Sequence, residues 1–172
     1  MKKRKPLCLL TTLVFSLIAA PLFALNSEMN RSTLQGLKGI KVLVEDLAPE
    51  VEREGLVKNQ IQKEIEVKLR TAGINILNQE EATRAPGEPY LYLNININLP
   101  KGEEAICSYS IDIALIQNVT LVQNPKQTTY AITWSTGGVG LIAKKSLSQL
   151  RESVEDVVEI FMKAFFSVNP KK

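Results

Sequence analysis

Two pairs of adjacent carboxylates are the residues best suited to catalysis in this chain. Glu45 adjoins Asp46, and Glu103 adjoins Glu104. Glycoside hydrolysis needs two carboxyl groups that face one cleft, about 5–10 Å apart. Neighbouring side chains along a strand point to opposite faces, so neither pair converges by spacing alone. A carboxylate-dependent hydrolase is therefore only an alternative for this sequence.

The composition excludes most other catalytic chemistry. The chain of 172 residues has no histidine and two cysteines, Cys8 and Cys107. Serine–histidine and cysteine–histidine nucleophile systems need an imidazole, and zinc sites need imidazoles or several thiolates. We therefore expect no catalytic residue, no metal site and no cofactor. Cys107 is expected to be a small buried side chain, with an intermolecular disulfide as the alternative.

A glycine cluster followed by two lysines is a candidate for a weak anion site, formed by Gly137, Gly138, Gly140, Lys144 and Lys145. Backbone amides at a helix N-terminus bind anions, and a helix is expected shortly after these lysines. The cluster lacks the Gly-Lys-Ser/Thr ending of a phosphate loop. The alternative is a flexible turn, in which glycine adopts dihedral angles that other residues avoid.

Small neutral polar residues alternate with apolar ones along the strands expected in the second half of the chain. The resulting polar face is formed by Asn94, Asn96, Asn98, Ser108, Ser110, Asp112, Thr129, Thr133 and Ser135. Asparagine is a poor strand former, so three in alternation require a reason. One interpretation is the solvent face of an antiparallel sheet. The other is a binding surface for a glycan or a partner protein.

Residues 1–24 have the layout of a signal peptide, with four basic residues, an apolar run and a small residue, Ala24, at the expected cut. If the cut fails, the segment becomes a membrane anchor. Cys8 precedes most of the apolar run, which is the wrong place for a lipid anchor. The whole chain has 21 basic and 18 acidic residues. Without this leader it is nearly neutral, so we expect export to the periplasm, or secretion, and no binding of nucleic acid.

The elements that position these residues follow from periodicity. A strand over 40–47 and a short strand over 74–77 flank an amphipathic helix over 56–72, which ends at Gly73. Residues 50–54 and 78–89 are expected to be loops. Strands are then predicted over 91–99, 109–122 and 129–135, with a turn at 124–126, and a helix over 147–167 whose start is marked by Ser146 and Gln149. Trp134 ends an alternating run and is expected to be buried.

This order predicts one α+β domain over residues 39–168, preceded by a flexible lead over 25–38 and followed by a tail over 169–172. Its sheet is mixed and mainly antiparallel, in the order β-α-β-β-β-β-α, with two helices packed on one face.

The segment Thr133-Trp134-Ser135 before the glycines and the helix end from Phe165 to Pro170 resemble a group of exported bacterial proteins without an assigned activity. The order of elements over 39–168 also resembles, in topology, two kinds of small periplasmic module. These are the N-terminal domain of the Tol-system translocation protein and the curli-secretion-type lipoproteins. The resemblance implies interaction with envelope proteins. The chain departs from the lipoproteins because it has no acceptor cysteine at the cleavage site.

The sequence thus predicts an exported, non-catalytic module that binds or assembles envelope proteins. Such a module can extend its sheet with a partner's strand at an exposed edge. The first alternative is a small-ligand or glycan-binding protein that uses the neutral polar face, and the second is the hydrolase. The sequence leaves the partner, the edge and the oligomeric state open.

Overall fold

Four strands form one mixed sheet in the order β1-β2-β3-β4. The computed structural model describes residues 25–102 and 105–170, so the predicted signal peptide lies outside the described residues. The strands are β1 (Lys41–Val44), β2 (Tyr90–Asn98), β3 (Ile106–Leu121) and β4 (Asn124–Ala143). β1 is parallel to β2, whereas β3 is antiparallel to both β2 and β4. The predicted α+β class with a mainly antiparallel sheet is confirmed.

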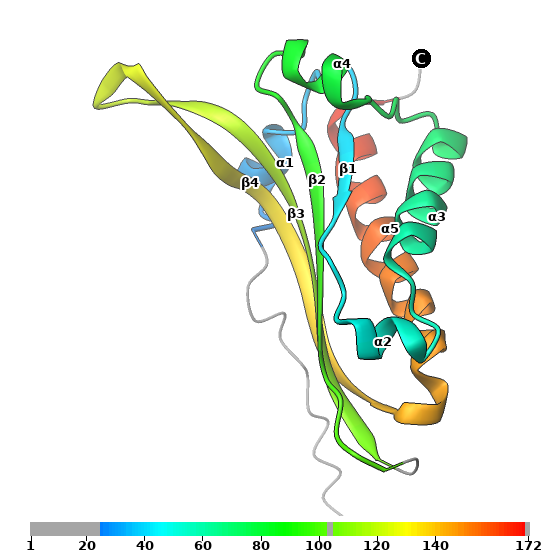
Figure 1. Cartoon of the computed structure of the whole chain (residues 1–172). Coiled ribbons are helices and arrows are strands. Elements are labelled where there is room, and N and C mark those ends of the chain that lie inside the picture. Colours follow the sequence, from blue (N-terminus) through cyan, green and yellow to red (C-terminus); the bar gives the residue numbers. More distant parts are fainter. Residues whose placement is uncertain (1–24, 103–104, 171–172) are drawn as a thin grey trace, which may run out of the picture.

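Helices α3 (Lys58–Ala72) and α5 (Leu150–Val168) lie on the same face of this sheet (Figure 1). The stripe predicted for α3 is buried at Ile61, Ile65 and Leu69. Gly73 ends the helix with a φ of 95°, a left-handed conformation that glycine adopts at little cost. Helices α3 and α5 leave the opposite face of the sheet uncovered (Figure 1), and we call it the open face.

Trp134 is central to the core beneath α5. Its side chain is fully buried, and its ring meets the ring of Phe161 edge to face at 5.3 Å between centroids. Such pairs add about 0.5–1.5 kcal/mol to the effect of burial. Cys107 is also fully buried, as expected, and has a free thiol. A buried thiol is not placed to form a disulfide with another chain.

The segment predicted as a flexible lead has a helix, α1 (Glu28–Ser32), and packs against the domain. Asn30 donates its backbone amide to the Ser27 side chain at 3.3 Å, which caps this helix. Leu34 is fully buried in the core. The prediction missed this segment because its contacts are with residues about a hundred or more positions away.

Two predicted loops also contain helices. Helix α2 (Pro49–Arg53) begins with a proline, which is favoured at the first helical position. Helix α4 (Gln79–Arg84) begins with a capping box between Asn78 and Glu81. The strand predicted over 74–77 is reduced to a single parallel bridge between Ile40 and Ile76.

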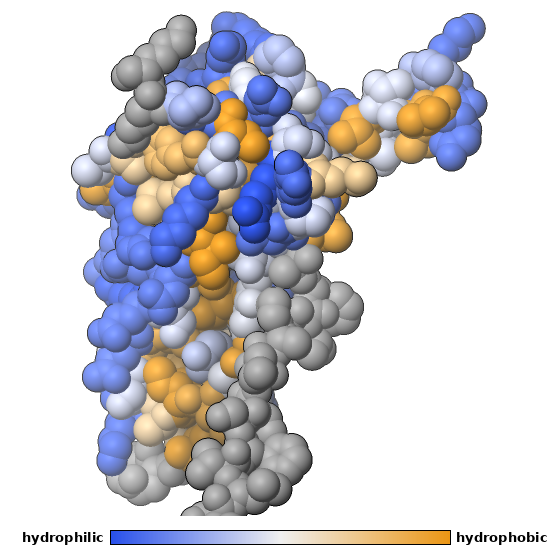
Figure 2. Space-filling view, turned by 180° about the vertical axis from the view of Figure 1, so that it is seen from behind, coloured by the Kyte–Doolittle hydropathy of each residue, from blue (hydrophilic) through white to orange (hydrophobic). Residues whose placement is uncertain are grey.

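The hairpin of β3 and β4 is longer than predicted. Its turn lies at Val122 and Gln123 rather than at 124–126, and β4 continues through the glycines to Ala143. The hairpin projects beyond the body of the domain, and apolar side chains lie near its tip (Figures 1 and 2). These include Val122, which is 91% exposed.

After β4 the chain enters a 3₁₀ helix, η1 (Lys144–Gln149), before α5. Ser146 and Gln149 were predicted to cap the final helix, but Gln149 precedes α5 without a side-chain cap bond. The first turns are 3₁₀ instead. Within the described part of the chain, no helix has both the length and the apolar character needed to cross a bilayer.

Candidate functional site: the open face and the free edge of β4

The polar face predicted from alternation is present on β2 and β3. Register places Asn94 opposite Asp112, Asn96 opposite Ser110 and Asn98 opposite Ser108. The Asn96 side chain donates hydrogen bonds to Asn94 Oδ1 at 2.9 Å and to Ser110 Oγ at 3.5 Å. The asparagines therefore form a polar ladder on the open face, within reach of solvent.

The prediction for β4 was partly wrong, because a β-bulge interrupts the strand. Leu115 pairs with Trp134, but the next residue, Ile116, pairs with Ile132, so Thr133 is an extra residue. A bulge exchanges the faces on its two sides. Gln117 donates to Thr133 Oγ1 at 2.8 Å and to the Thr33 carbonyl at 3.2 Å, which places Thr133 beside the end of α1.

Beyond the bulge the faces of β4 are exchanged relative to the prediction. Thr129 leaves the polar face, whereas Tyr130 and Ile132 lie on the open face and are 51% and 52% exposed. Tyr130 meets Tyr90 edge to face at 6.2 Å, which confirms that it shares the face of the even-numbered residues of β2. The open face therefore gains apolar and aromatic side chains that alternation assigned to the core.

Tyrosines form a cluster on the open face, and periodicity alone did not single them out. The Tyr92 hydroxyl donates to a Glu45 carboxylate oxygen, and the Tyr130 hydroxyl donates to Glu88 Oε2 at 2.7 Å. The hydrogen bond to Glu45, and to a smaller extent burial, raises the pKa of Tyr92 to about 12. The hydrogen bond to Glu88 likewise raises the pKa of Tyr130. Both phenols are neutral donors at physiological pH.

Further along the open face, apolar residues of β4 lie beside the asparagine ladder. Val139 pairs with Ser110 and Leu141 with Ser108, and each is 74% exposed. Together with Asn96, Asn98 and neighbouring residues they line a shallow groove of about 670 Å³. Sequence reasoning missed Val139 and Leu141 because it ended the strand at the glycines.

The last seven residues of β4 form a free edge. β4 is the outermost strand of the sheet, and the Ser135 amide donates away from β3, to the Leu25 carbonyl at 3.2 Å. The Leu25 amide donates in return to Ser135 Oγ at 3.4 Å, so Ser135 is held by the N-terminal segment. Among the described residues, no strand pairs with the outer side of the segment Gly137–Ala143, which we call the free edge.

The glycine loop on which the predicted anion site depended does not form. Gly137, Gly138 and Gly140 lie inside β4, opposite Asp112, Ile111 and Tyr109 respectively. Lys144 follows in η1 and forms an ion pair with Glu54 at 3.2 Å. The glycines are therefore part of a strand and do not form a phosphate-binding loop. Their lack of side chains affects how this strand packs.

The first predicted carboxylate pair, Glu45 and Asp46, does not converge on a cleft, because its two members contact different partners. Glu45 accepts from Tyr92, whereas Asp46 pairs with Lys58 at 2.5 Å between Oδ1 and Nζ. Glu103 and Glu104 lie outside the described residues. Across residues 25–102 and 105–170, no group of three or more acidic, cysteine or histidine side chains is placed to hold a metal ion.

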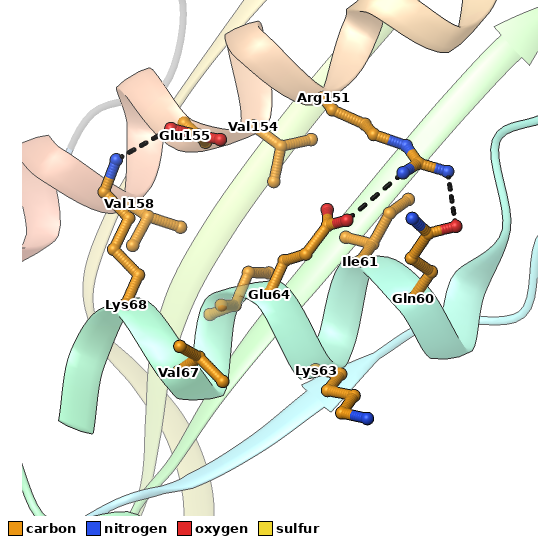
Figure 3. A pocket seen from close by; sticks show the side chains of 11 residues that line it. Gln60, Ile61, Lys63, Glu64, Val67, Lys68, Arg151, Val154, Glu155 and Val158 are labelled. Atoms are coloured by element: carbon orange, nitrogen blue, oxygen red, sulfur yellow. Dashed lines mark hydrogen bonds and ion pairs between the residues drawn. The ribbon is translucent and has the colours of Figure 1, made fainter. Parts of the chain in front are cut away.

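A second hollow lies between α3 and α5, with a volume of about 630 Å³ (Figure 3). Its floor is apolar, and charged side chains span it. Arg151 contacts Glu64 at 3.1 Å and Gln60 at 2.8 Å, and Lys68 contacts both Glu155 and Glu159 at 3.0 Å.

Lys68 and Arg151 use their charges in contacts between the two helices. Burial lowers the pKa of Lys68, but its hydrogen bonds to Glu159 and Glu155 outweigh that effect and raise the pKa. The hydrogen bond to Lys68 lowers the pKa of Glu159. These groups therefore stay ionised at neutral pH. We interpret the hollow as the seam where α3 and α5 are held together.

Comparisons with known proteins leave the family open. No family model matches the chain, and no curated protein matches it. Among solved structures, it is similar to the dodecamer of a PelC point variant from Paraburkholderia phytofirmans, with 18% identity and a TM-score of 0.42 over 76% of this chain and 92% of that one. A second PelC dodecamer from the same organism shares 17% identity, with a TM-score of 0.39 over 73% and 83% of the two chains. Similarity at this level leaves the function of the chain undecided.

Proposed function

We propose that this chain is an exported, non-catalytic module of the cell envelope that binds protein partners through the free edge of β4 and the adjoining open face. The observation that carries the proposal is the seven-residue free edge, which includes the exposed side chains of Val139 and Leu141. An exposed edge offers unpaired amides and carbonyls to a partner's strand. Export is supported by the layout of residues 1–24.

The open face adds the side-chain chemistry that such a surface needs. Aromatic residues are enriched at protein interfaces because they combine a large apolar ring with a polar group. Tyr90, Tyr92 and Tyr130 lie on this face. The asparagine ladder lies next to them and supplies neutral donors and acceptors. The face thus combines apolar contact area with polar groups that fix orientation.

The test is site-specific photocrosslinking in intact envelopes. A photoreactive residue at Leu141 is compared with one at Glu152, an exposed position on α5. We expect Leu141 to crosslink to a discrete protein and Glu152 to give no such product. That protein, once identified by mass spectrometry and purified, should bind the wild-type chain and lose at least about tenfold in affinity with Leu141→Lys. Equal crosslinking at both positions contradicts the proposal.

A glycan-binding function is the second candidate, and the tyrosines beside the asparagine ladder favour it. Sugar rings bind through apolar contact with aromatic rings and hydrogen bonds to neutral polar groups. This function predicts that purified wall glycan binds the chain, and that Tyr92→Ala or the double variant Asn94→Thr with Asn96→Thr weakens this binding. Leu141→Lys then has no effect on it. Glycan binding without a protein partner would replace the first proposal by the second.

A further inference from the structure

The free edge of β4 presents its backbone groups at alternate residues. In an antiparallel pair, each residue directs its amide and carbonyl either to the neighbouring strand or away from it. The Ser135 amide points away from β3, whereas the Lys144 amide donates to Ala105 on the β3 side at 3.0 Å. The odd-numbered residues from Gly137 to Ala143 therefore direct their amides and carbonyls to the free edge.

This edge lacks the features by which proteins protect an outer strand. Such protection consists of charged residues, proline, short length or a covering segment. The free edge has the sequence Gly-Gly-Val-Gly-Leu-Ile-Ala, without charge or proline. The opposite edge of the sheet differs, since β1 has only four residues, begins with Lys41 and is preceded by the bridge between Ile40 and Ile76. Within the described chain, Leu25 hydrogen-bonds to the outer side of β4 at Ser135, before the free edge begins.

We infer that the free edge binds the free edge of a second copy of this chain, which makes one continuous sheet across a two-fold axis. This inference rests on the proposed protein-binding function and names its partner. An antiparallel pair centred on Gly140 brings Val139 opposite Leu141 of the second copy, and Gly137 opposite Ala143 of the second copy. All four odd-numbered residues then exchange backbone hydrogen bonds, because the same strand supplies matching donors and acceptors on both sides.

Side chains on the open face favour a second copy over a charged or bulky strand. Val139 and Leu141 project to the same face, so pairing unites these two side chains of each copy in one apolar cluster. Cross-strand apolar pairs stabilise a sheet, and like charges directly opposite destabilise it. Because the free edge carries no charge, two copies bring no like charges together. A β-carbon added to Gly138 would have no atom within 4 Å, so no side chain crowds the strand at that position.

The experiment is analytical ultracentrifugation of the purified chain, as processed by its host, at about 1–100 µM. A single strand pair buries less area than a standard interface, so we expect a concentration-dependent monomer–dimer equilibrium. Val139→Lys and Leu141→Lys should each raise the dimer dissociation constant at least about tenfold. Val122→Lys, an exposed aliphatic residue at the hairpin tip, is the matched control and should leave it unchanged.

Hydrogen exchange identifies the segment directly. Amides of the free edge should gain protection as the concentration rises in the wild type, and lose this gain in Leu141→Lys. Circular dichroism checks that the lysine variants remain folded, and Val139→Thr offers a milder change. A wild-type monomer at about 100 µM, or a dimer that both lysine variants keep, overturns the inference. If that monomer still crosslinks through Leu141 to another protein, the proposed function stands without the second copy.

Discussion

Gly137 on β4 lies against the Ile111 carbonyl of β3, with no room for a side chain between them. A β-carbon placed on Gly137 would lie 2.5 Å from that oxygen and 2.7 Å from Asp112 Oδ1. The nearer of these atoms belongs to the backbone, which cannot turn away. The glycine therefore permits close approach of β3 and β4 where the sequence had suggested a flexible turn.

Gly137→Ala is expected to destabilise the domain by about 1–3 kcal/mol, because the added methyl forces the strands apart. Gly138→Ala is the matched control, since its added methyl meets open space. Replacing a strand glycine without a clash costs nothing and favours the folded state slightly. Urea unfolding measures both variants. Equal stability of the two variants would show that the contact at Gly137 is relieved without cost.

The Tyr92 hydroxyl is expected to ionise late and to make stability depend on alkaline pH. Its hydrogen bond to Glu45 raises its pKa from 10.0 to about 12 in the folded chain. The folded state therefore holds this proton more tightly than the unfolded chain. The resulting stabilisation is complete below about pH 10 and is lost as the pH rises through about 12.

Absorbance of tyrosinate in the near ultraviolet measures this titration. Tyr92→Phe should remove one phenol that ionises near pH 12, and Glu45→Gln should move that ionisation back toward pH 10. Urea unfolding at about pH 9 and about pH 11 should show a smaller loss of stability in Tyr92→Phe than in the wild type. An unchanged titration in Glu45→Gln would mean that Glu45 does not control the phenol.

Asn26 is expected to hold the N-terminal segment against the domain by accepting a hydrogen bond from Trp134, the only tryptophan of the sequence. Trp134 Nε1 donates to Asn26 Oδ1 at 3.0 Å, from a fully buried ring. Asn26→Leu leaves this N–H without its partner, which costs about 1–3 kcal/mol. Tryptophan fluorescence reports the change and urea unfolding its cost. Asn75→Leu, which removes an exposed bond of 3.4 Å to the Lys38 carbonyl, is the control and should have the smaller effect.

Arg151 is expected to hold α5 against α3 and the end of α2. Its guanidinium donates to the Gly55 carbonyl at 2.9 Å and to Gln60 at 2.8 Å, and pairs with Glu64 at 3.1 Å. Arg151→Ala should lower the free energy of unfolding by about 1–3 kcal/mol, since hydrogen bonds to a charged group are stronger than neutral ones. Lys63→Ala removes an exposed cation of the same hollow and should change it by less than about 0.5 kcal/mol.

Arg151→Met separates the packing of the side chain from its charge. If the methionine variant is as stable as the wild type, the apolar stem of Arg151 accounts for its effect and the ion pair does not. If it loses as much stability as alanine, the hydrogen bonds account for it. Partner binding through Leu141 should be unchanged in both variants, because Arg151 lies across the sheet from the open face.

Several parts of the fold were predictable because their signals are local. The helix over 56–72 became α3 with its buried stripe and its left-handed Gly73, and the alternation over 91–99 became β2. The polar ladder from Asn94 to Asn98 followed from that alternation. Burial of Trp134 and Cys107 also agreed with the tendencies of their side chains. For the helix and the strand, a repeat of 3.6 or two residues determines which side faces the core.

The candidate site depended on features that no local repeat contains. The bulge at Thr133 moved Tyr130 and Ile132 to the open face, because one extra residue exchanges the faces of a strand. Gly137 and its neighbours suggested a turn because glycine is common in turns, but their strand pairing comes from β3. The order of the strands alone made β4 an edge.

The sequence by itself determined the class of the domain, its two covering helices, its nearly neutral charge and the absence of histidine chemistry. These properties depend on composition and on periodicity within one element. The tertiary structure decided which edge stays unpaired, which residues share the open face and how the N-terminal segment is held. The unpaired edge depends on the order of the strands, and the N-terminal segment on contacts about a hundred residues away in sequence. The open face depends on the register between β3 and β4, where a shift by one residue reverses every side chain.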